Sequence, residues 1–309
     1  MKKIIRILSV FVLSILTLTA CSIEGEKVNE DTTSTKSSKE AKEDITIGVS
    51  LSTLNNPFFV SVRDGIEEVA KDKNVKVVIS DAQNDSAEQS NQIDDLIQQK
   101  VDLLLINPVD SQAISPAVES ANTANIPVIC VDRGSDSGEI VSLVASDNVE
   151  GGKMAGEYIL EKLGENAKVA QLEGIPGASS TRERGEGFEK ATEGKIDLVS
   201  QTANFDRSEG MNVMENMIQA NPDIKAVFSQ NDEMALGASE ALSSKDDILI
   251  VGFDGTEDAL KAVEDGTMSA TVAQKPHEMG KIAMQTAVKY LNGEKVEENI
   301  SSPLELITK

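Results

Sequence analysis

The fold is indicated most clearly by residues 45–80, which read ITIGVSLSTLNNPFFVSVRDGIEEVAKDKNVKVVIS. The stretch begins with the apolar run 45–51 and ends with a second run, 75–80, and both are rich in Val and Ile. Between them, residues 57–73 have the apolar spacing of an amphipathic helix. Nearly continuous apolar runs are typical of strands buried on both faces, so this stretch predicts a strand–helix–strand unit of a parallel sheet.

The same alternation continues along the chain. Further apolar runs that we expect to be strands are 101–106, 126–131, 141–145, 169–172, 196–200, 226–229, 248–253 and 270–273. Amphipathic segments such as 88–99 separate most of them. About ten strands exceed a comfortable single sheet, so the sequence predicts an α/β protein with two doubly wound parallel-sheet domains. The change of domain is expected near Asp147, and a final helix, roughly 275–291, is expected to lead back to the first domain.

Polar and aromatic side chains follow the expected strands at the point where each strand ends. In order, the ends carry Ser52, Asn55, Asn56, Phe58 and Phe59, then Asn107, then Asp132 and Arg133, then Arg182 and Arg184, then Phe205, Asn231, Asp254 and Gln274. In open parallel sheets, ligands bind beyond the carboxyl ends of the strands. The sequence therefore predicts that these residues form one site.

The chemistry of this set suits a sugar. Asp132 and Asp254 accept hydrogen bonds and Arg133 and Arg184 donate them, while Asn and Gln do both. The two acids and the two arginines cancel in charge, which favours a neutral polyol over an anionic sugar phosphate. Phe side chains offer flat faces for the C–H side of a sugar ring.

Simpler explanations exist for single members of the set. Asn56 before Pro57 is a good helix N-cap, and Asp254 before Gly255 could cap in the same way. Phe59 or Phe205 alone would more often be a core residue. Because so many independent strand ends carry the same chemistry, we favour a shared site.

Taken together, several segments resemble the family of bacterial D-ribose-binding proteins, the substrate-binding components of ribose ABC transporters. The resemblance runs from about Ile45 to near the C-terminus. It is carried by the segments 52–59 (STLNNPFF), 105–108 (LINP), 131–133 (VDR), 182–188 (RERGEGF), 230–235 (QNDEMA) and 251–256 (VGFDGT).

The resemblance implies a fold, a site and a role. The fold is the type I periplasmic binding protein fold, with lobes at 44–146 plus 275–303 and at 147–274 plus 304–309, joined by a three-strand hinge. The implied ribose contacts are Ser52, Asn56, Phe58, Phe59, Asn107, Asp132, Arg133, Arg184, Phe205, Asn231, Asp254 and Gln274. The implied role is to capture D-ribose by hinge closure and to deliver it to an ABC-type permease. A chemoreceptor is a further candidate partner, and we expect a monomer.

The first 43 residues are expected to lie outside the fold. Lys2, Lys3 and Arg6 precede an apolar stretch, 7–18, that is too short for a confident membrane span. The stretch ends in LTAC at Cys21 and resembles the bacterial lipobox, which implies a signal peptide at 1–20, lipidation of Cys21 and an anchor on the outer face of the cytoplasmic membrane. Residues 22–43 are polar and are expected to form a flexible tether. The alternative is a generic signal peptide with a chance Cys.

Composition excludes several other roles. The formal net charge of −23 argues against a nucleic-acid partner. A single histidine, His277, makes a His-based metal site or catalytic triad implausible, and no P-loop or Gly-x-Ser-x-Gly motif is present. We therefore expect no metal, no cofactor and no enzymatic activity. Cys130 lies in an apolar run and is expected to be a buried, inert thiol.

Two other readings stay open at this point. A related sugar, allose or a furanose-like signalling molecule, could replace ribose in the same fold and role. Sugar-responsive repressors share the fold but need an N-terminal helix-turn-helix, and here that place holds the expected signal and tether.

Overall fold

The computed structural model describes residues 45–245 and 247–309, and this part of the chain carries two six-stranded sheets. The first sheet contains β1 (Thr46–Leu51), β2 (Lys76–Asp81), β3 (Leu103–Ile106), β4 (Val128–Val131), β5 (Ser142–Ser146) and β11 (Asn299–Ser302). The second contains β6 (Lys168–Glu173), β7 (Asp197–Thr202), β8 (Ile224–Ser229), β9 (Leu249–Asp254), β10 (Ala270–Ala273) and β12 (Glu305–Thr308). The predicted signal peptide (1–20), Cys21 and the tether (21–43) lie outside the described residues.

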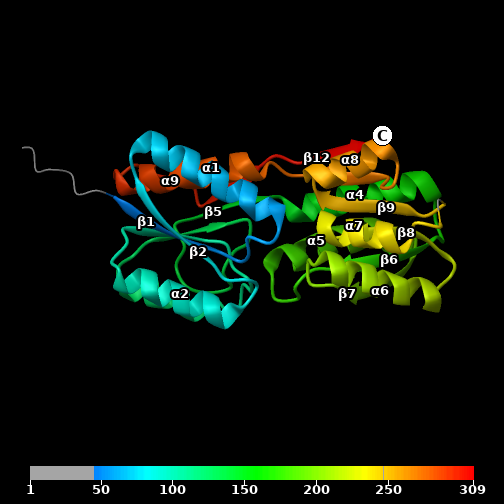
Figure 1. Cartoon of the computed structure of the whole chain (residues 1–309), viewed down its shortest axis with the longest axis horizontal. Helices are drawn as coiled ribbons and strands as arrows, with labels where there is room; N and C mark the ends of the chain where they lie inside the picture. Colours follow the sequence, from blue (N-terminus) through cyan, green and yellow to red (C-terminus); the bar gives the residue numbers. More distant parts are fainter. Residues whose placement is uncertain (1–44, 246) are drawn as a thin grey trace, which may run out of the picture. The chain divides into compact units, whose positions relative to one another are not determined.

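Helices cover both faces of each sheet (Figure 1). The first sheet is covered by α1 (Pro57–Lys73) and α9 (Pro276–Leu291) on one face and by α2 (Ser86–Gln98) and α3 (Ser115–Thr123) on the other. The second is covered by α4 (Asn148–Leu163) and α5 (Ser179–Thr192) on one face and by α6 (Arg207–Ala220), α7 (Asp232–Ala241) and α8 (Glu257–Asp265) on the other. Strands buried on both faces explain the continuous apolar runs of the sequence.

The two sheets have the same internal order. The first reads β11-β5-β4-β3-β1-β2 and the second reads β12-β10-β9-β8-β6-β7. The strands of the first sheet all pair in parallel. This doubly wound α/β architecture confirms the predicted fold class. In both sheets the order reverses beside the first strand, at β1 and at β6, and such reversals are where ligands bind in open α/β sheets.

The chain passes between the two sheets after β5, after β10 and after β11. We therefore keep the lobe boundaries 44–146 plus 275–303 and 147–274 plus 304–309 as a proposal, supported by this strand membership. The two lobes are called the N-terminal and the C-terminal lobe below.

One strand differs from the parallel expectation. β12 pairs with β10 in the antiparallel sense. The carboxyl ends of the strands of both sheets meet at the shared site described below, so the parallel strands of the two lobes point toward each other. A chain that leaves β11 and continues directly into the other sheet must therefore run against its neighbours there.

The loops that follow the strands are shaped by side-chain caps. Asn56 accepts a hydrogen bond from the amide of Phe58 (2.9 Å), at the start of α1. Asn231 accepts from the amide of Met234 (2.9 Å), at the start of α7. Such caps satisfy amides that have no partner within the helix. They also hold polar residues at the carboxyl edges of both sheets.

Among the helices within residues 45–245 and 247–309, none combines the length and the apolar character needed to cross a bilayer.

Candidate functional site

A small cavity lies between the two lobes. It is lined by Asn56, Phe58, Phe59, Asp132, Arg133, Arg184, Phe205, Asn231 and Asp254. The most exposed of these residues is Phe205, which is only 9% accessible, so the lining of the cavity is buried. Every lining residue belongs to the set predicted from the strand ends. Of the other five residues in that set, Ser52, Asn107 and Gln274 are also buried, whereas Asn55 and Arg182 are exposed and do not line the cavity.

The N-terminal lobe contributes the loops after β1, β3 and β4. Ser52 follows β1 directly, and its backbone amide donates to the Oδ1 of Asn107 (3.2 Å), which follows β3. The Nδ2 of Asn107 donates in turn to the carbonyl of Val131 (3.0 Å) and lies 3.4 Å from the Oδ2 of Asp132. Hydrogen bonds between neighbouring strand ends thus hold this half of the site.

The C-terminal lobe contributes α5 and the loops after β7, β8, β9 and β10. Arg184 lies on α5, and its Nε donates to the Oδ1 of Asn148 (2.9 Å) while its Nη1 donates to the carbonyl of Gln230 (2.6 Å). Asp254 ends β9, and its Oδ1 accepts from the Nε2 of Gln274 (2.9 Å). Both charged groups are therefore held in place by the lobe's own hydrogen bonds.

Aromatic rings from both lobes line the cavity. The rings of Phe58 and Phe59 meet edge to face, with centroids 5.1 Å apart. The guanidinium of Arg133 lies 5.2 Å from the ring centroid of Phe59 and 5.0 Å from that of Phe205, which belongs to the other lobe. A cation at these distances from two rings is attracted to both, so Arg133 links the aromatic groups of the two lobes.

The backbone of Phe205 is unusual. Its φ is 61°, a left-handed conformation that is rare for a bulky residue. Gly174 makes room for the ring, because a Cβ added there would lie 2.0 Å from the Cζ of Phe205. Asp132 (φ 66°) and Asp254 (φ 131°) also have positive φ. Strained backbone of this kind gathers at functional sites and is held by the surrounding packing.

The four charged side chains, Asp132, Arg133, Arg184 and Asp254, are linked to one another by ion pairs. The Nε of Arg133 lies 3.5 Å from the Oδ2 of Asp132, and Arg184 lies 3.9 Å from Asp132 and 3.8 Å from Asp254. Burial lowers the pKa of Arg133 and raises the pKa of Asp254 well above its ordinary value, because removal from water disfavours the charged form. The cluster balances two acids with two bases, as the sequence predicted.

Several polar atoms of the predicted set have no hydrogen-bond partner in the described part of the protein, two on residues that line the cavity and two on buried residues outside its lining. Within the described residues, the buried Ser52 Oγ, Asp132 Oδ1, Arg133 Nε and Gln274 Oε1 have no hydrogen-bond partner. Buried polar groups are nearly always paired, and each exception calls for an explanation. Buried acceptors and donors of the predicted set that lack hydrogen-bond partners among the described residues fit a ligand with several hydroxyl groups.

Sequence reasoning missed the residues that position this set. The side-chain Nε2 of Gln89 donates to the backbone carbonyl of Asn107 (2.8 Å), and its Oε1 accepts from the backbone amide of Val109 (2.8 Å). Asn148 and Gln230 hold Arg184, as described above. Gln230 adjoins Asn231 in a segment that carries the family resemblance, so it could have been found there. Gln89 lies within a polar stretch of α2 and gave no signal.

The simpler explanations apply to some residues and not to others. Asn56 both caps α1 and lines the cavity. Asp254 does not cap α8, whose N-cap is Thr256, so the capping interpretation is wrong there. Phe59 and Phe205 pack in the hydrophobic cores of their lobes and also reach the cavity.

Two residues outside the site can be placed as well. Cys130 is buried and free, and burial raises the pKa of its thiol to about 12, which confirms an inert thiol. His277 lies away from the cavity and contacts Glu68 on α1, at 3.2 Å.

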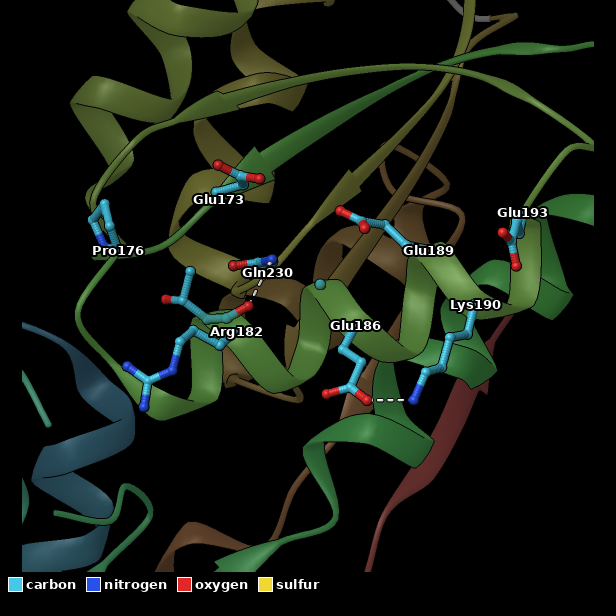
Figure 2. A pocket seen from close by; sticks show the side chains of 10 residues that line it. Glu173, Pro176, Arg182, Glu186, Glu189, Lys190, Glu193 and Gln230 are labelled. Carbon is cyan, nitrogen blue, oxygen red and sulfur yellow. Dashed lines mark hydrogen bonds and ion pairs between the residues drawn. The ribbon is translucent and has the colours of Figure 1, made fainter. Parts of the chain in front are cut away.

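A larger hollow, of about 550 Å³, lies on the C-terminal lobe beside α5 (Figure 2). Four glutamates line it, namely Glu173, Glu186, Glu189 and Glu193, and Lys190 pairs with Glu186. Its excess of negative charge contrasts with the balanced cavity between the lobes. None of the predicted ligand contacts lines it, and within the described residues no group of His, Cys, Asp or Glu could hold a metal ion.

Two α/β lobes that enclose a buried polar cavity at their strand ends define a two-lobed solute-binding protein. Residues 47–295 match the model of the periplasmic binding protein domain, and the chain belongs to this family of extracytoplasmic binding proteins.

Known relatives are similar over nearly the whole chain. A ribose import binding protein of Bacillus subtilis (strain 168) is 54% identical over 310 residues, which cover 100% of this chain and 99% of the relative. A ribose import binding protein of Escherichia coli (strain K12) is 52% identical over 268 residues, or 85% and 90% of the two chains. The crystal structure of an ABC transporter solute-binding protein from Mycobacterium smegmatis, with bound glycerol, superimposes with a TM-score of 0.83 at 34% identity and covers 86% of this chain and 94% of that one.

Proposed function

We propose that this chain is the D-ribose-binding component of an ABC importer. The observation that carries the proposal is the buried cavity between the lobes, where two acids, two arginines and three Phe rings meet with no excess of charge. The similarity to ribose import binding proteins along the full chain supports the same role. The chain binds and releases its ligand and is not an enzyme.

The polar side chains have distinct roles in this proposal. Asp132 and Asp254 accept hydrogen bonds from ribose hydroxyls, and Arg133 and Arg184 donate to them. The free Oγ of Ser52 and the free Oε1 of Gln274 complete the set. Phe58, Phe59 and Phe205 pack against the C–H faces of the ring.

Tight binding of so small a ligand requires closure. Ribose has about ten heavy atoms, and micromolar affinity corresponds to roughly −8 kcal/mol. That is close to 1 kcal/mol per atom, near the ceiling for very small ligands. Such efficiency needs almost complete burial, which two lobes that close on the sugar can provide. The permease then recognises the closed form.

We also propose that the chain is held at the outer face of the cytoplasmic membrane through lipidated Cys21, with residues 22–43 as a tether. Support comes only from the sequence pattern at 1–21, because this segment lies outside the described residues. Each buried CH₂ group of an acyl chain contributes about 0.8 kcal/mol, so two or more chains anchor firmly. A chemoreceptor is a further partner in this proposal.

The test is a calorimetric titration of residues 44–309, which hold both sheets, with D-ribose. Allose, xylose, arabinose, glucose and galactose follow under the same conditions. We expect one ribose per chain at micromolar affinity or tighter, with the other sugars about a hundredfold weaker, or about 2.7 kcal/mol. Heat with allose or another sugar but not with ribose would remove ribose as the ligand and keep the transport role.

A further inference from the structure

The two lobes touch along a second line of contacts, outside the sugar cavity. On the N-terminal lobe the contacts lie in the loops after β3 and β4, and on the C-terminal lobe they lie at the start of α5. None of the side chains in these contacts lines the cavity. We call the set formed by Asp110, Ser111, Asp136, Gly177, Ser179 and Arg182 the latch.

Ser111 is bonded to the other lobe twice. Its backbone amide donates to the carbonyl of Gly177 (3.0 Å), and its Oγ accepts from the amide of Ser179 (3.1 Å). Ser179 is the first residue of α5, and the N-cap position holds Ala178, whose side chain cannot cap. The hydroxyl that satisfies the first amide of α5 therefore comes from the opposite lobe.

An ion pair lies beside these bonds. The Nη2 of Arg182 donates to the Oδ1 of Asp136 across the two lobes, at 2.7 Å. The Nη1 of the same guanidinium donates to the carbonyl of Gly177 (2.9 Å), which fixes its orientation. Both side chains are close to half exposed, so water and salt screen the pair.

Gly177 is fitted closely against Asp110. A Cβ at Gly177 would lie 1.6 Å from the Oδ2 of Asp110. The carboxylate cannot easily move aside, because its Oδ1 accepts hydrogen bonds from the amides of Gln112 and Ala113, both at 2.8 Å. A side chain at position 177 would therefore prevent the two lobes from coming as close together as they do in this structure.

We propose that the latch sets the affinity for the sugar from outside the cavity, by stabilising the closed arrangement of the lobes. The apparent dissociation constant of a ligand equals its intrinsic value divided by the fraction of protein in the binding-competent form. Every contact made only on closure therefore tightens binding without touching the sugar. Arg184 lies on α5, the helix whose first amide Ser111 satisfies. The latch therefore also helps to hold a residue of the cavity in position.

Three variants of residues 44–309 test the latch, with the ribose dissociation constant measured by calorimetry. We expect Gly177→Ala to weaken binding at least tenfold. We expect Ser111→Ala to weaken it about fivefold, in keeping with the loss of an N-cap. Asp136→Asn should weaken it about twofold at low salt, with the difference vanishing at high salt. Small-angle scattering at saturating ribose should show Gly177→Ala less compact than the parent.

Gly194→Ala is the matched control. It lies on the same lobe at φ 68°, with no atom within 4 Å of an added Cβ. Backbone strain should lower its melting temperature while ribose affinity stays at the parent value. This separates a loss of stability from a loss of affinity.

The inference rests on ribose as the ligand, and the outcomes keep the two proposals apart. A parent chain that ignores ribose but binds another sugar of the panel overturns the ligand, and the latch is then judged with that sugar. Parent-like affinity in Gly177→Ala overturns the latch. If Gly177→Ala does not fold, parent-like affinity in both Ser111→Ala and Asp136→Asn overturns it instead.

Discussion

The two lobes share one strand order, yet they hold their buried charges differently. Each contributes one acid and one arginine to the cavity, so neither lobe is charged there on its own. In the N-terminal lobe, Asp132 lies 3.5 Å from its chain neighbour Arg133. In the C-terminal lobe, Asp254 lies 3.8 Å from Arg184, and a further buried acid, Asp232, lies nearby.

The pKa values reflect this difference. Burial raises the pKa of Asp254 well above its ordinary value and raises the pKa of Asp232 to about 6. The C-terminal lobe thus carries carboxylates whose charge is costly in the folded state. The comparison teaches that one topology can build two halves of a site at unequal cost in stability.

The strongest test of the comparison is a pair of substitutions, Asp254→Asn and Asp132→Asn. Both should weaken ribose binding about a hundredfold, since each removes a charged acceptor of sugar hydroxyls. Their effects on sugar-free stability should differ in sign. A raised folded pKa means that stability from Asp254 is lost as pH rises through that pKa, so Asp254→Asn should raise the melting temperature at pH 7. Asp132→Asn should lower it, because it leaves a buried guanidinium without its partner.

Calorimetry for binding and thermal unfolding without sugar check this pair. Equal shifts of melting temperature in the same direction would contradict the difference between the lobes. Parent-like ribose affinity in either variant would remove that residue from the site.

A second test concerns the aromatic residue of the C-terminal lobe. Gly174→Ala places a Cβ 2.0 Å from the Phe205 ring and should displace it from the cavity. We expect ribose affinity to fall about tenfold, as expected for loss of a packed aromatic contact. Gly164→Ala, on the same lobe with no atom within 4 Å, is the control and should bind normally. Unchanged affinity in Gly174→Ala would mean that the Phe205 ring contributes little.

The third test uses pH. Asp232 accepts from the amide and Oγ1 of Thr256 and from the Oγ1 of Thr271, yet burial dominates and raises its pKa from 3.8 to about 6. Its contribution to stability is complete below pH 3.8 and is lost as pH rises to about 6. Asp232→Asn should remove this dependence, which amounts to about 3 kcal/mol over the whole range and about 2 kcal/mol between pH 4.5 and pH 7.

Urea unfolding of parent and variant at pH 4.5 and pH 7 measures the difference directly. The charge of Asp232 also raises the pKa of Asp254, so the difference between the two profiles includes the relief of that effect in the variant. Parallel pH profiles would show that Asp232 does not carry a raised pKa.

The smallest effect is expected at Cys130, in the N-terminal lobe. Its thiol is fully buried, with a pKa of about 12. Residues 44–309 contain no other cysteine, so alkylation should be negligible in the native chain and should appear only as that lobe unfolds. Rapid modification in native buffer would contradict this burial.

Much of the fold can be predicted from the sequence, because strands buried on both faces appear in it as continuous apolar runs. The helix predicted at 57–73 is α1 with the same bounds, and Pro57 stands at its start as the signal at Asn56 and Pro57 predicts. The antiparallel pairing of β12 could not be predicted, because it depends on how the lobes face each other. Most site residues stand at or just after strand ends, where a topological rule gathers them, whereas Arg184 lies within α5.

The supporting residues were hidden for the same physical reason. Gln89, Asn148 and Gly174 act through contacts with residues far away in the chain, and no local pattern marks such a partner. The close fit between Gly177 and Asp110 likewise exists only where the two lobes touch, so the sequence gives no sign of it.

The passage of the chain back to its first lobe has a consequence for biosynthesis. The core of the N-terminal lobe includes Met279, Ala283, Met284 and Ala287 of α9, and β11 extends its sheet. These elements emerge from the ribosome only after residues 147–274 of the C-terminal lobe, and β12 of that lobe follows them. Domains usually fold in order of synthesis, but here the lobe that begins first stays incomplete until nearly all of the second has been made. A nascent chain of this design stays incomplete until translation is nearly over, a property suited to a protein that must be threaded through a membrane before it folds.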